Sequence, residues 1–226
     1  MANASILKAL EQVPHILGPI TRRDGMILPL FIDTVPLMFK PSTFKVVIRE
    51  LAKEVSKMDI DIVAGGITPG VPLAAGVSLE INKSFACVRK EPKGYSQKRV
   101  VDGDIKPGNK VVLIDDFYVS GENKEIFIEH IATTGGVVTD ILSVGLLSEK
   151  LLFDWQLKFP NVRVHYLVNY IEASHHLAEV GIISAELDTI VKYFVMDPYN
   201  WQENKDIWNK FNSLLPTEFL SKHLYG

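Results

Sequence analysis

The feature that most constrains the fold is the segment of residues 110–116, in which four consecutive apolar residues precede two aspartates. Its apolar residues do not alternate with polar ones, which is typical of a strand covered on both faces in a parallel sheet. A short turn with Ser120 and Gly121 follows, and residues 122–132 then read as a helix that ends before Gly135 and Gly136. This strand–turn–helix unit predicts an α/β fold.

In the rest of the chain, predicted strands also alternate with predicted helices. Apolar spacing predicts helices over residues 5–12, 44–55 and 72–81, and short apolar runs predict strands over residues 61–64, 85–88, 140–147 and 162–168. Prolines indicate an irregular segment between residues 13 and 41, and residues 90–107 have the polar, basic composition of a long loop. We therefore predict an open, mostly parallel, twisted sheet flanked by helices over residues 1–196. An N-terminal segment (1–42) belongs to this domain, and a helical tail (197–226) follows it.

Charge and composition exclude several classes of protein. The formal net charge of −3 disfavours general binding to nucleic acid, which requires a dense basic face. The single cysteine, Cys87, excludes an intramolecular disulfide, and the N-terminus has no signal-peptide pattern. No run reaches the ~20 apolar residues of a membrane helix. The expectation is a cytoplasmic protein without a membrane or nucleic-acid partner.

Asp115 and Asp116 lie where ligands bind in open α/β sheets, beyond the carboxyl end of a strand. Two adjacent carboxylates are costly there unless they meet hydroxyl groups or a cation. The free N–H groups at the start of the following helix favour a phosphate. The unit therefore offers acceptors for sugar hydroxyls beside donors for a phosphate. The alternative interpretation is an ordinary surface pair of aspartates that caps a helix.

Three further segments extend this pattern: residues 20–25 (Ile-Thr-Arg-Arg-Asp-Gly), residues 63–74, which contain Gly65, Gly66 and Thr68, and residues 88–94 (Val-Arg-Lys-Glu-Pro-Lys-Gly). In this order, and with the strand that ends at Asp115 and Asp116, the chain resembles the orotate phosphoribosyltransferase family of type I phosphoribosyltransferases. The resemblance covers roughly residues 18–145. The combination of the basic segment with the aspartate pair is specific, whereas each segment alone is weak.

The resemblance implies an enzyme that transfers the 5-phosphoribosyl group from phosphoribosyl pyrophosphate to a nucleobase, with Mg²⁺ and release of pyrophosphate. Orotate is the default acceptor, which would place the reaction in pyrimidine nucleotide synthesis. The N-terminal segment would contribute the base pocket. In the family the basic loop reaches into a neighbouring subunit, which implies a homodimer.

The resemblance also assigns roles to residues. The catalytic loop would contain Arg89, Lys90, Lys93 and Tyr95. Phosphoribosyl pyrophosphate would be bound by Gly65, Gly66, Thr68, Asp115, Asp116, Ser120, Gly121, Glu122 and Asn123. Arg23 and Phe31 would contact the base. Asp115 and Asp116 would bind the metal indirectly, through phosphoribosyl pyrophosphate and water.

The chain departs from the family pattern at several of these positions. Val119 and Glu122 replace small or hydroxyl residues of the phosphate turn, and Tyr95 stands where the family has a histidine. No arginine follows the strand over residues 140–147, where Lys150 is a possible substitute for binding the orotate carboxylate. An alternative function is therefore a catalytically weakened module that binds phosphoribosyl pyrophosphate or a nucleotide for regulation.

Overall fold

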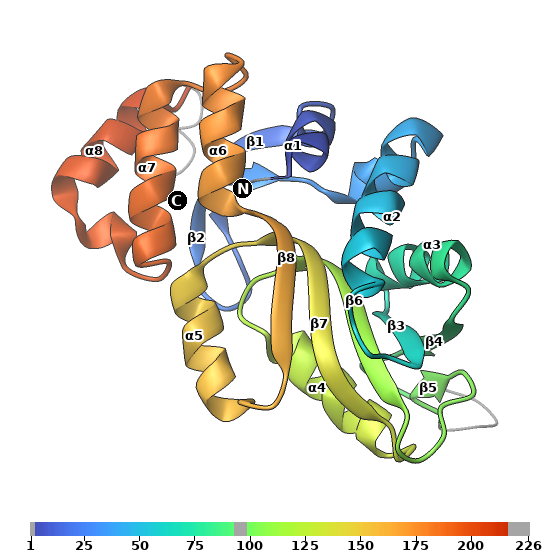
Figure 1. The fold of residues 1–226 in the computed structure, drawn as a ribbon. Coiled ribbons are helices and arrows are strands. Elements are labelled where there is room, and N and C mark those ends of the chain that lie inside the picture. The colour runs from blue at the N-terminus through green and yellow to red at the C-terminus, as the bar shows by residue number, and fades with distance from the viewer. Residues whose placement is uncertain (1–2, 93–98, 217–226) are drawn as a thin grey trace.

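The computed structural model describes residues 3–92 and 99–216. Its central sheet has six strands in the order β5-β4-β3-β6-β7-β8 (Figure 1). The bounds are β3 Ile62–Gly66, β4 Ser84–Val88, β5 Val101–Asp102, β6 Lys110–Tyr118, β7 Val137–Leu146 and β8 Arg163–Asn169. Neighbouring strands are parallel except at the β4–β5 edge. The predicted open, mostly parallel α/β sheet is confirmed, although the loop predicted over residues 90–107 contains the short strand β5.

Helices cover both faces of this sheet. Helices α2 (Pro41–Val55) and α3 (Gly70–Ile81) lie on one face, and α4 (Glu122–Ala132) and α5 (Glu149–Lys158) lie on the other (Figure 1). Along β6, Val112 and Ile114 belong to the core on the α2–α3 side, whereas Val111 and Leu113 belong to the core on the α4–α5 side. Both faces of β6 are therefore buried, which explains the unbroken apolar run in the sequence.

The N-terminal segment forms a hairpin rather than the irregular stretch that its prolines indicate. Strands β1 (His15–Thr21) and β2 (Ile27–Ile32) pair antiparallel after the short helix α1 (Ala4–Leu10). Pro19 lies at a register shift between Leu17 and Ile20, where a missing N–H group is tolerated. A two-stranded sheet has only edge strands, so prolines do not exclude strands here, and the expectation was wrong. The 3₁₀ helix η1 (Val35–Met38) connects the hairpin to α2.

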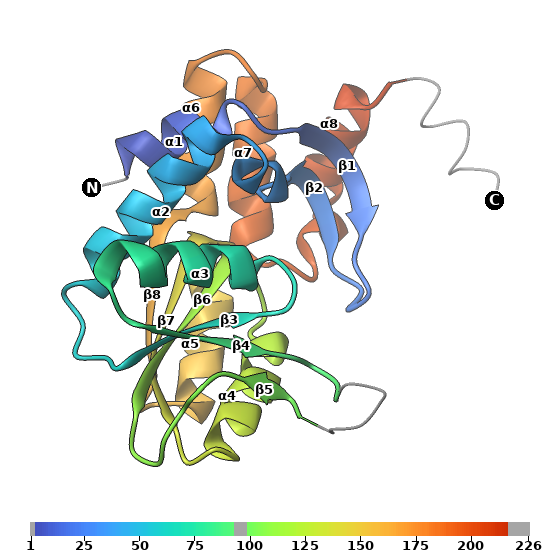
Figure 2. The same ribbon diagram turned by 90° about the vertical axis from the view of Figure 1, so that its right-hand side faces the viewer.

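The C-terminal helical part, residues 170–214, packs against this hairpin (Figure 2). It consists of α6 (Tyr170–Glu179), α7 (Ala185–Met196), the 3₁₀ helix η2 (Trp201–Glu203) and α8 (Lys205–Leu214). Trp201 Nε1 donates a hydrogen bond to the Ile27 carbonyl at 2.8 Å, and the Tyr170 hydroxyl donates one to the Leu30 carbonyl. The hairpin is thus fixed by side chains from the far end of the sequence. Within the described parts of the chain, no helix is long and apolar enough to cross a membrane.

Asp140, near the start of β7, is fully buried and accepts hydrogen bonds from Arg163 Nε and Nη2, both at 2.8 Å, and from His165 Nε2 at 2.9 Å. Burial alone would raise the pKa of Asp140, but the hydrogen bonds from Arg163 and His165 outweigh burial and lower it. A lowered pKa in the folded state means that protons bind preferentially to the unfolded chain. The stability contributed by Asp140 is therefore complete above the unfolded pKa of 3.8 and is lost as the pH falls through the folded pKa.

We expect Asp140→Asn to reduce the free energy of unfolding at pH 7 by about 2 kcal/mol, the typical contribution of hydrogen bonds to a charged group. The difference from wild type should shrink at the lowest pH at which the wild type remains folded. Urea titrations at the two pH values measure it, with the exposed Asp104→Asn as control. A loss that does not change with pH would contradict this account of Asp140.

Candidate active site

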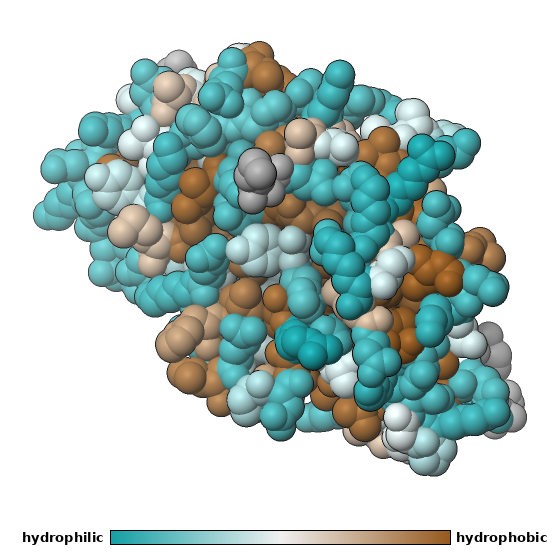
Figure 3. All heavy atoms as spheres, in the orientation of Figure 1, coloured by the Kyte–Doolittle hydropathy of each residue, from teal (hydrophilic) through white to brown (hydrophobic). Residues whose placement is uncertain are grey.

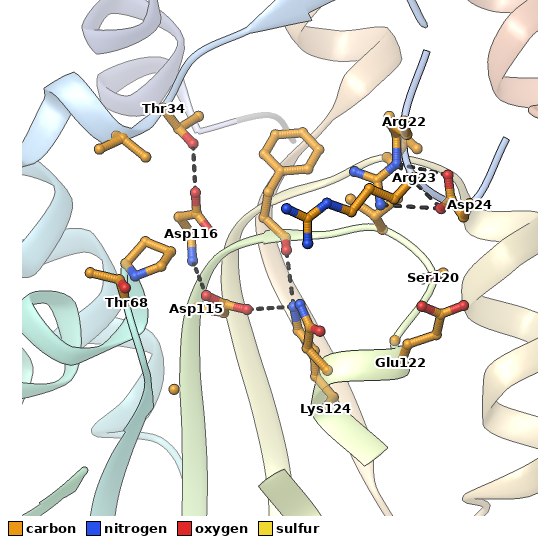
Figure 4. Close-up of a pocket in the computed structure, with 18 of the residues that line it drawn as sticks. Arg22, Arg23, Asp24, Thr34, Thr68, Asp115, Asp116, Ser120, Glu122 and Lys124 are labelled. Atoms are coloured by element: carbon orange, nitrogen blue, oxygen red, sulfur yellow. Dashed lines mark hydrogen bonds and ion pairs between the residues drawn. The ribbon is translucent and has the colours of Figure 1, made fainter. Parts of the chain in front are cut away.

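A cavity of about 860 Å³ opens at the carboxyl ends of β3 and β6, below the hairpin (Figure 4). It collects residues from six separate parts of the sequence: the hairpin and η1, the turn after β3, the segment after β4, the segment from β6 into α4, Leu147 after β7, and Tyr170 at the start of α6. The predicted residues that line it are Arg23, Phe31, Gly66, Thr68, Lys90, Asp115, Asp116, Ser120, Gly121, Glu122 and Asn123. This position matches the general rule for ligand sites in open parallel sheets.

Asp116 projects towards the segment that follows the hairpin, and the Thr34 hydroxyl donates a hydrogen bond to its Oδ2 at 3.1 Å (Figure 4). Burial raises the pKa of Asp116, and the neighbouring charge of Asp115 adds to this effect, giving a value of about 6. The carboxylate is therefore mostly ionised at neutral pH. A buried ionised carboxylate with remaining acceptor capacity is suited to hydroxyl donors of a ligand.

Asp115 has different surroundings. Its Oδ2 receives the Lys124 ammonium in an ion pair, and its Oδ1 accepts a hydrogen bond from the Asp116 N–H at 3.0 Å. Lys124 is only 4% exposed and also donates to the Phe117 carbonyl at 3.1 Å. Lys124 was not predicted as a site residue from the sequence, because a lysine near the start of a helix ordinarily points to solvent.

The turn before α4 has the geometry of an anion site. Gly121 is the N-cap of α4 and has φ +83°, a left-handed conformation that favours glycine. A Cβ on Gly121 would also lie 2.4 Å from Trp155 Cδ1. The first N–H groups of α4 lack partners inside the helix and lie beside Ser120 at the cavity. Glu122 lines the same cavity, so its carboxylate partly offsets this positive end.

The turn between β3 and α3 forms the opposite wall. Gly66 and Thr68 line the cavity, and the peptide bond between Ile67 and Thr68 is cis. A Cβ on Gly66 would lie 2.2 Å from the Phe127 ring, so glycine is required for this close packing. Gly65 is buried behind the wall, where a Cβ would meet the Gly70 carbonyl oxygen at 2.4 Å. Gly65 therefore shapes the turn without lining the cavity.

The basic residues that follow β4 have different surroundings. Lys90 is exposed at the cavity rim, whereas Arg89 forms an ion pair with Asp102 at 3.0 Å and is not among the cavity residues. Lys93 and Tyr95 lie outside the described residues. The structure thus brings one member of the predicted catalytic loop, Lys90, to the cavity and holds another, Arg89, against β5.

Above the aspartates, the hairpin supplies Phe31 and two arginines. Arg22 pairs with Asp24 at 3.2 Å, whereas Arg23 extends into the cavity (Figure 4). No ion pair of Arg23 is found among the described residues. The possible substitute Lys150 is turned away from the cavity and lies 3.7 Å from Asp197. Arg23 is therefore the better-placed cation for an acidic group on a base.

A metal ion would find few protein ligands in this cavity. Within residues 3–92 and 99–216, no group of three or more His, Cys, Asp or Glu side chains could hold one. Asp115 is already neutralised by Lys124, which leaves Asp116 as the available carboxylate of the pair. Mg²⁺ commonly binds through one or two carboxylates together with ligand phosphates and water. The residues present fit a magnesium ion that enters with a diphosphate ligand.

Similar proteins point in the same direction. The chain is 34% identical over 138 residues to orotate phosphoribosyltransferase from Methanosarcina mazei, a match that covers 61% of this chain and 73% of the relative. Orotate phosphoribosyltransferase from Aeropyrum pernix superposes with a TM-score of 0.64 at 26% identity, covering 80% of this chain and 99% of that one.

Leishmania donovani UMP synthase gives a TM-score of 0.76 at 24% identity and supports the fold; the match covers 87% of this chain and 42% of that chain. No protein-family model matches the sequence. The cavity described above and the similarity to the Methanosarcina enzyme agree with the resemblance carried by the four sequence segments. The chain belongs to the orotate phosphoribosyltransferase family.

Proposed function

We propose that the protein transfers the 5-phosphoribosyl group from phosphoribosyl pyrophosphate to a nucleobase, with orotate as the default acceptor, in pyrimidine nucleotide synthesis. The observation that carries this proposal is the order of groups around one cavity. Amides of the Ser120–Gly121 turn suit a 5′-phosphate, Asp116 suits ribose hydroxyls, and Thr68 with Lys90 suits a pyrophosphate. These groups surround a single ligand with two phosphorylated ends.

In this reaction the bond between the anomeric carbon and pyrophosphate breaks as the base nitrogen attacks. Negative charge grows on the departing pyrophosphate, so Lys90 at the cavity rim would stabilise it. Positive charge grows on the ribose, so the nearby carboxylate of Asp116 would stabilise that side. Thr68 and the backbone at Gly66 would position the pyrophosphate by hydrogen bonds.

We propose Mg²⁺ as the cofactor, held indirectly by Asp116 through water and by the phosphates of the substrate. When bound, the ion neutralises charge on the pyrophosphate leaving group. The protein residues contribute by orienting the ribose and excluding water from it. Requirement for the metal is tested by loss of activity with a chelator and its return with added Mg²⁺.

For the acceptor, we propose that Arg23 and Phe31 bind the base below the hairpin. Phe31 offers an apolar ring face, and the Arg23 guanidinium, which has no ion pair among the described residues, can bind a carboxylate in a bidentate manner. Orotate is a pyrimidine that carries a carboxylate, so it matches both groups. A base without a carboxylate would leave Arg23 without its partner.

The test is release of pyrophosphate by the purified protein with Mg²⁺, phosphoribosyl pyrophosphate and a panel of bases. We expect turnover with orotate, and little with uracil, adenine or hypoxanthine. Arg23→Met should raise the KM for orotate about tenfold while leaving the KM for phosphoribosyl pyrophosphate nearly unchanged, as expected for loss of one charged hydrogen-bond pair. Tight binding of phosphoribosyl pyrophosphate without turnover of any base would instead support the regulatory module.

We also propose that the protein is a cytoplasmic homodimer. Exposed apolar side chains support an interface, among them Leu79 of α3, which is 84% exposed, and apolar atoms gather over α3 in Figure 3. Light scattering should give about twice the chain mass of 25.3 kDa, whereas a monomer at micromolar concentration would contradict the dimer.

A further inference from the structure

The buried ion pair between Lys124 and Asp115 separates the two aspartates into different environments. Both carboxylate oxygens of Asp115 are engaged, one by the Lys124 ammonium and the other by the Asp116 N–H. Lys124 is 4% exposed and Asp115 is 8% exposed, so water screens this pair weakly. Asp115 therefore carries a paired charge, and little of its surface is open to a new donor from a ligand.

Asp116 differs from Asp115 in its exposure and in the partners of its carboxylate. It is partly exposed at the cavity, and among the described residues the side-chain donor to its carboxylate is the neutral Thr34 hydroxyl, which contacts Oδ2. The Phe117 N–H also donates to its carboxylate, and no ion pair of that carboxylate is found among the described residues. The structure thus presents, on adjacent residues of β6, one carboxylate that is paired with a cation and one that is not.

The Lys124 ammonium beside Asp115 balances part of the acidic charge around the cavity. The hairpin contributes Arg22, Arg23 and Asp24, and the segment after it contributes Asp33. The segment after β4 contributes Lys90, and α4 contributes Glu122 and Lys124. Arg22 is already paired with Asp24. Without Lys124, three acidic groups, Asp115, Asp116 and Glu122, would face a phosphorylated ligand from β6 and α4 together.

The Lys124 ammonium is also held in place from two other directions. It donates to the Phe117 carbonyl at 3.1 Å and lies 5.4 Å from the centre of the Tyr118 ring, within cation–π range. These contacts orient Nζ towards Asp115 rather than towards the centre of the cavity. The protein itself therefore holds this ammonium through three groups.

We propose that Lys124 is a positioning residue that holds Asp115 in an internal ion pair, so that Asp116 is the carboxylate that receives the ribose hydroxyls. The inference rests on the proposed function and divides a role that the family resemblance assigns to both aspartates. Asp115 then shapes the site through its bond to the Asp116 N–H, and Lys124 keeps the cavity from repelling phosphate.

The test compares the affinities of ribose 5-phosphate and inorganic phosphate, measured by calorimetry. The ratio of the two affinities reports the contacts to the sugar, because both ligands carry a phosphate and one carries hydroxyl groups. The variants are Asp116→Asn, Lys124→Met and the double variant Asp115→Asn/Lys124→Met. The double variant removes the ion pair while preserving net charge, and thermal unfolding of each protein is measured alongside.

Asp116→Asn is expected to reduce the affinity ratio about tenfold, and the double variant should keep it within about threefold of wild type. Lys124→Met alone should weaken both ligands about tenfold, because Asp115 becomes an unpaired negative charge, and adding Asp115→Asn should restore most of this loss. If Lys124 only supports the fold, Lys124→Met will lower the unfolding temperature without changing either affinity in the folded protein.

The proposal is overturned if the double variant loses the affinity ratio as fully as Asp116→Asn does, since Asp115 would then contact the sugar. It is also overturned if Asp115→Asn fails to restore phosphate binding to Lys124→Met. Failure of the proposed function looks different: the wild type would bind ribose 5-phosphate in preference to phosphate and yet release no pyrophosphate with any base.

Discussion

Replacing Lys90 with alanine is expected to lower kcat about 10²–10³-fold, the usual effect of removing one group that stabilises charge in a transition state. Lys90 is exposed at the rim of the cavity, and among the described residues it has no ion pair. Its ammonium is thus available to the departing pyrophosphate. Steady-state rates of pyrophosphate release with saturating orotate and phosphoribosyl pyrophosphate measure the effect.

The matched control for this change is Lys106→Ala. Lys106 is also exposed but lies in the loop before β6, where it pairs at 3.5 Å with Asp104. It should leave kcat and the unfolding temperature unchanged. Because Lys90 contributes no buried area, its variant should also unfold at the wild-type temperature. A Lys90→Ala enzyme with full kcat would exclude Lys90 from the chemical step.

The largest expected effect on stability comes from Trp201→Ala, which should reduce the free energy of unfolding by about 3–5 kcal/mol. Trp201 is 3% exposed and contacts the rings of Phe194, Trp208 and Phe211 edge-on. The change would remove this packing and also the hydrogen bond to the Ile27 carbonyl of β2. Denaturant titration measures the loss.

Trp208→Ala is the control, since Trp208 belongs to the same cluster but is only partly buried and has no hydrogen bond to the hairpin among the described contacts. We expect a smaller loss, about 1–2 kcal/mol, in line with its smaller buried area. Trp201→Ala should in addition raise the KM for the base, because β2 carries Phe31. Equal losses in the two variants would contradict a special role of Trp201 in fixing the hairpin.

Sequence reasoning succeeded where the information is local. The segment from β6 to α4 was predicted closely: residues 110–116 lie within β6, and the helix predicted over residues 122–132 coincides with α4. An unbroken apolar run and a glycine turn determine such a unit without help from distant residues. The helices α5, α6 and α7 were not predicted. The buried positions of α6 and α7 include polar residues such as Ser174 and Asp188, which weaken the apolar pattern, and α5 buries only Leu152 and Trp155.

In the site, too, residues that are adjacent in sequence were easier to predict than residues brought together by folding. Asp115, Asp116 and the Ser120–Gly121 turn could be identified because they are adjacent in sequence. Thr34 could not, since its bond to Asp116 spans 82 residues. Lys124 lies nine residues from Asp115, yet only the folded turn brings its side chain back beneath β6. Charge counting along residues 115–125 gives the one sequence signal, an isolated cation among acidic residues.

The hairpin above the cavity is held in part through its backbone, because Tyr170 and Trp201 donate to the carbonyls of Leu30 and Ile27. A carbonyl acceptor is the same whatever side chain its residue carries, so these anchors do not restrict the residues that face the ligand. Acceptor preference could therefore be re-engineered by substitutions at Arg23 or Phe31 while the roof of the cavity keeps its position. During evolution, preference for a different base could therefore arise without changes to the contacts that hold the hairpin.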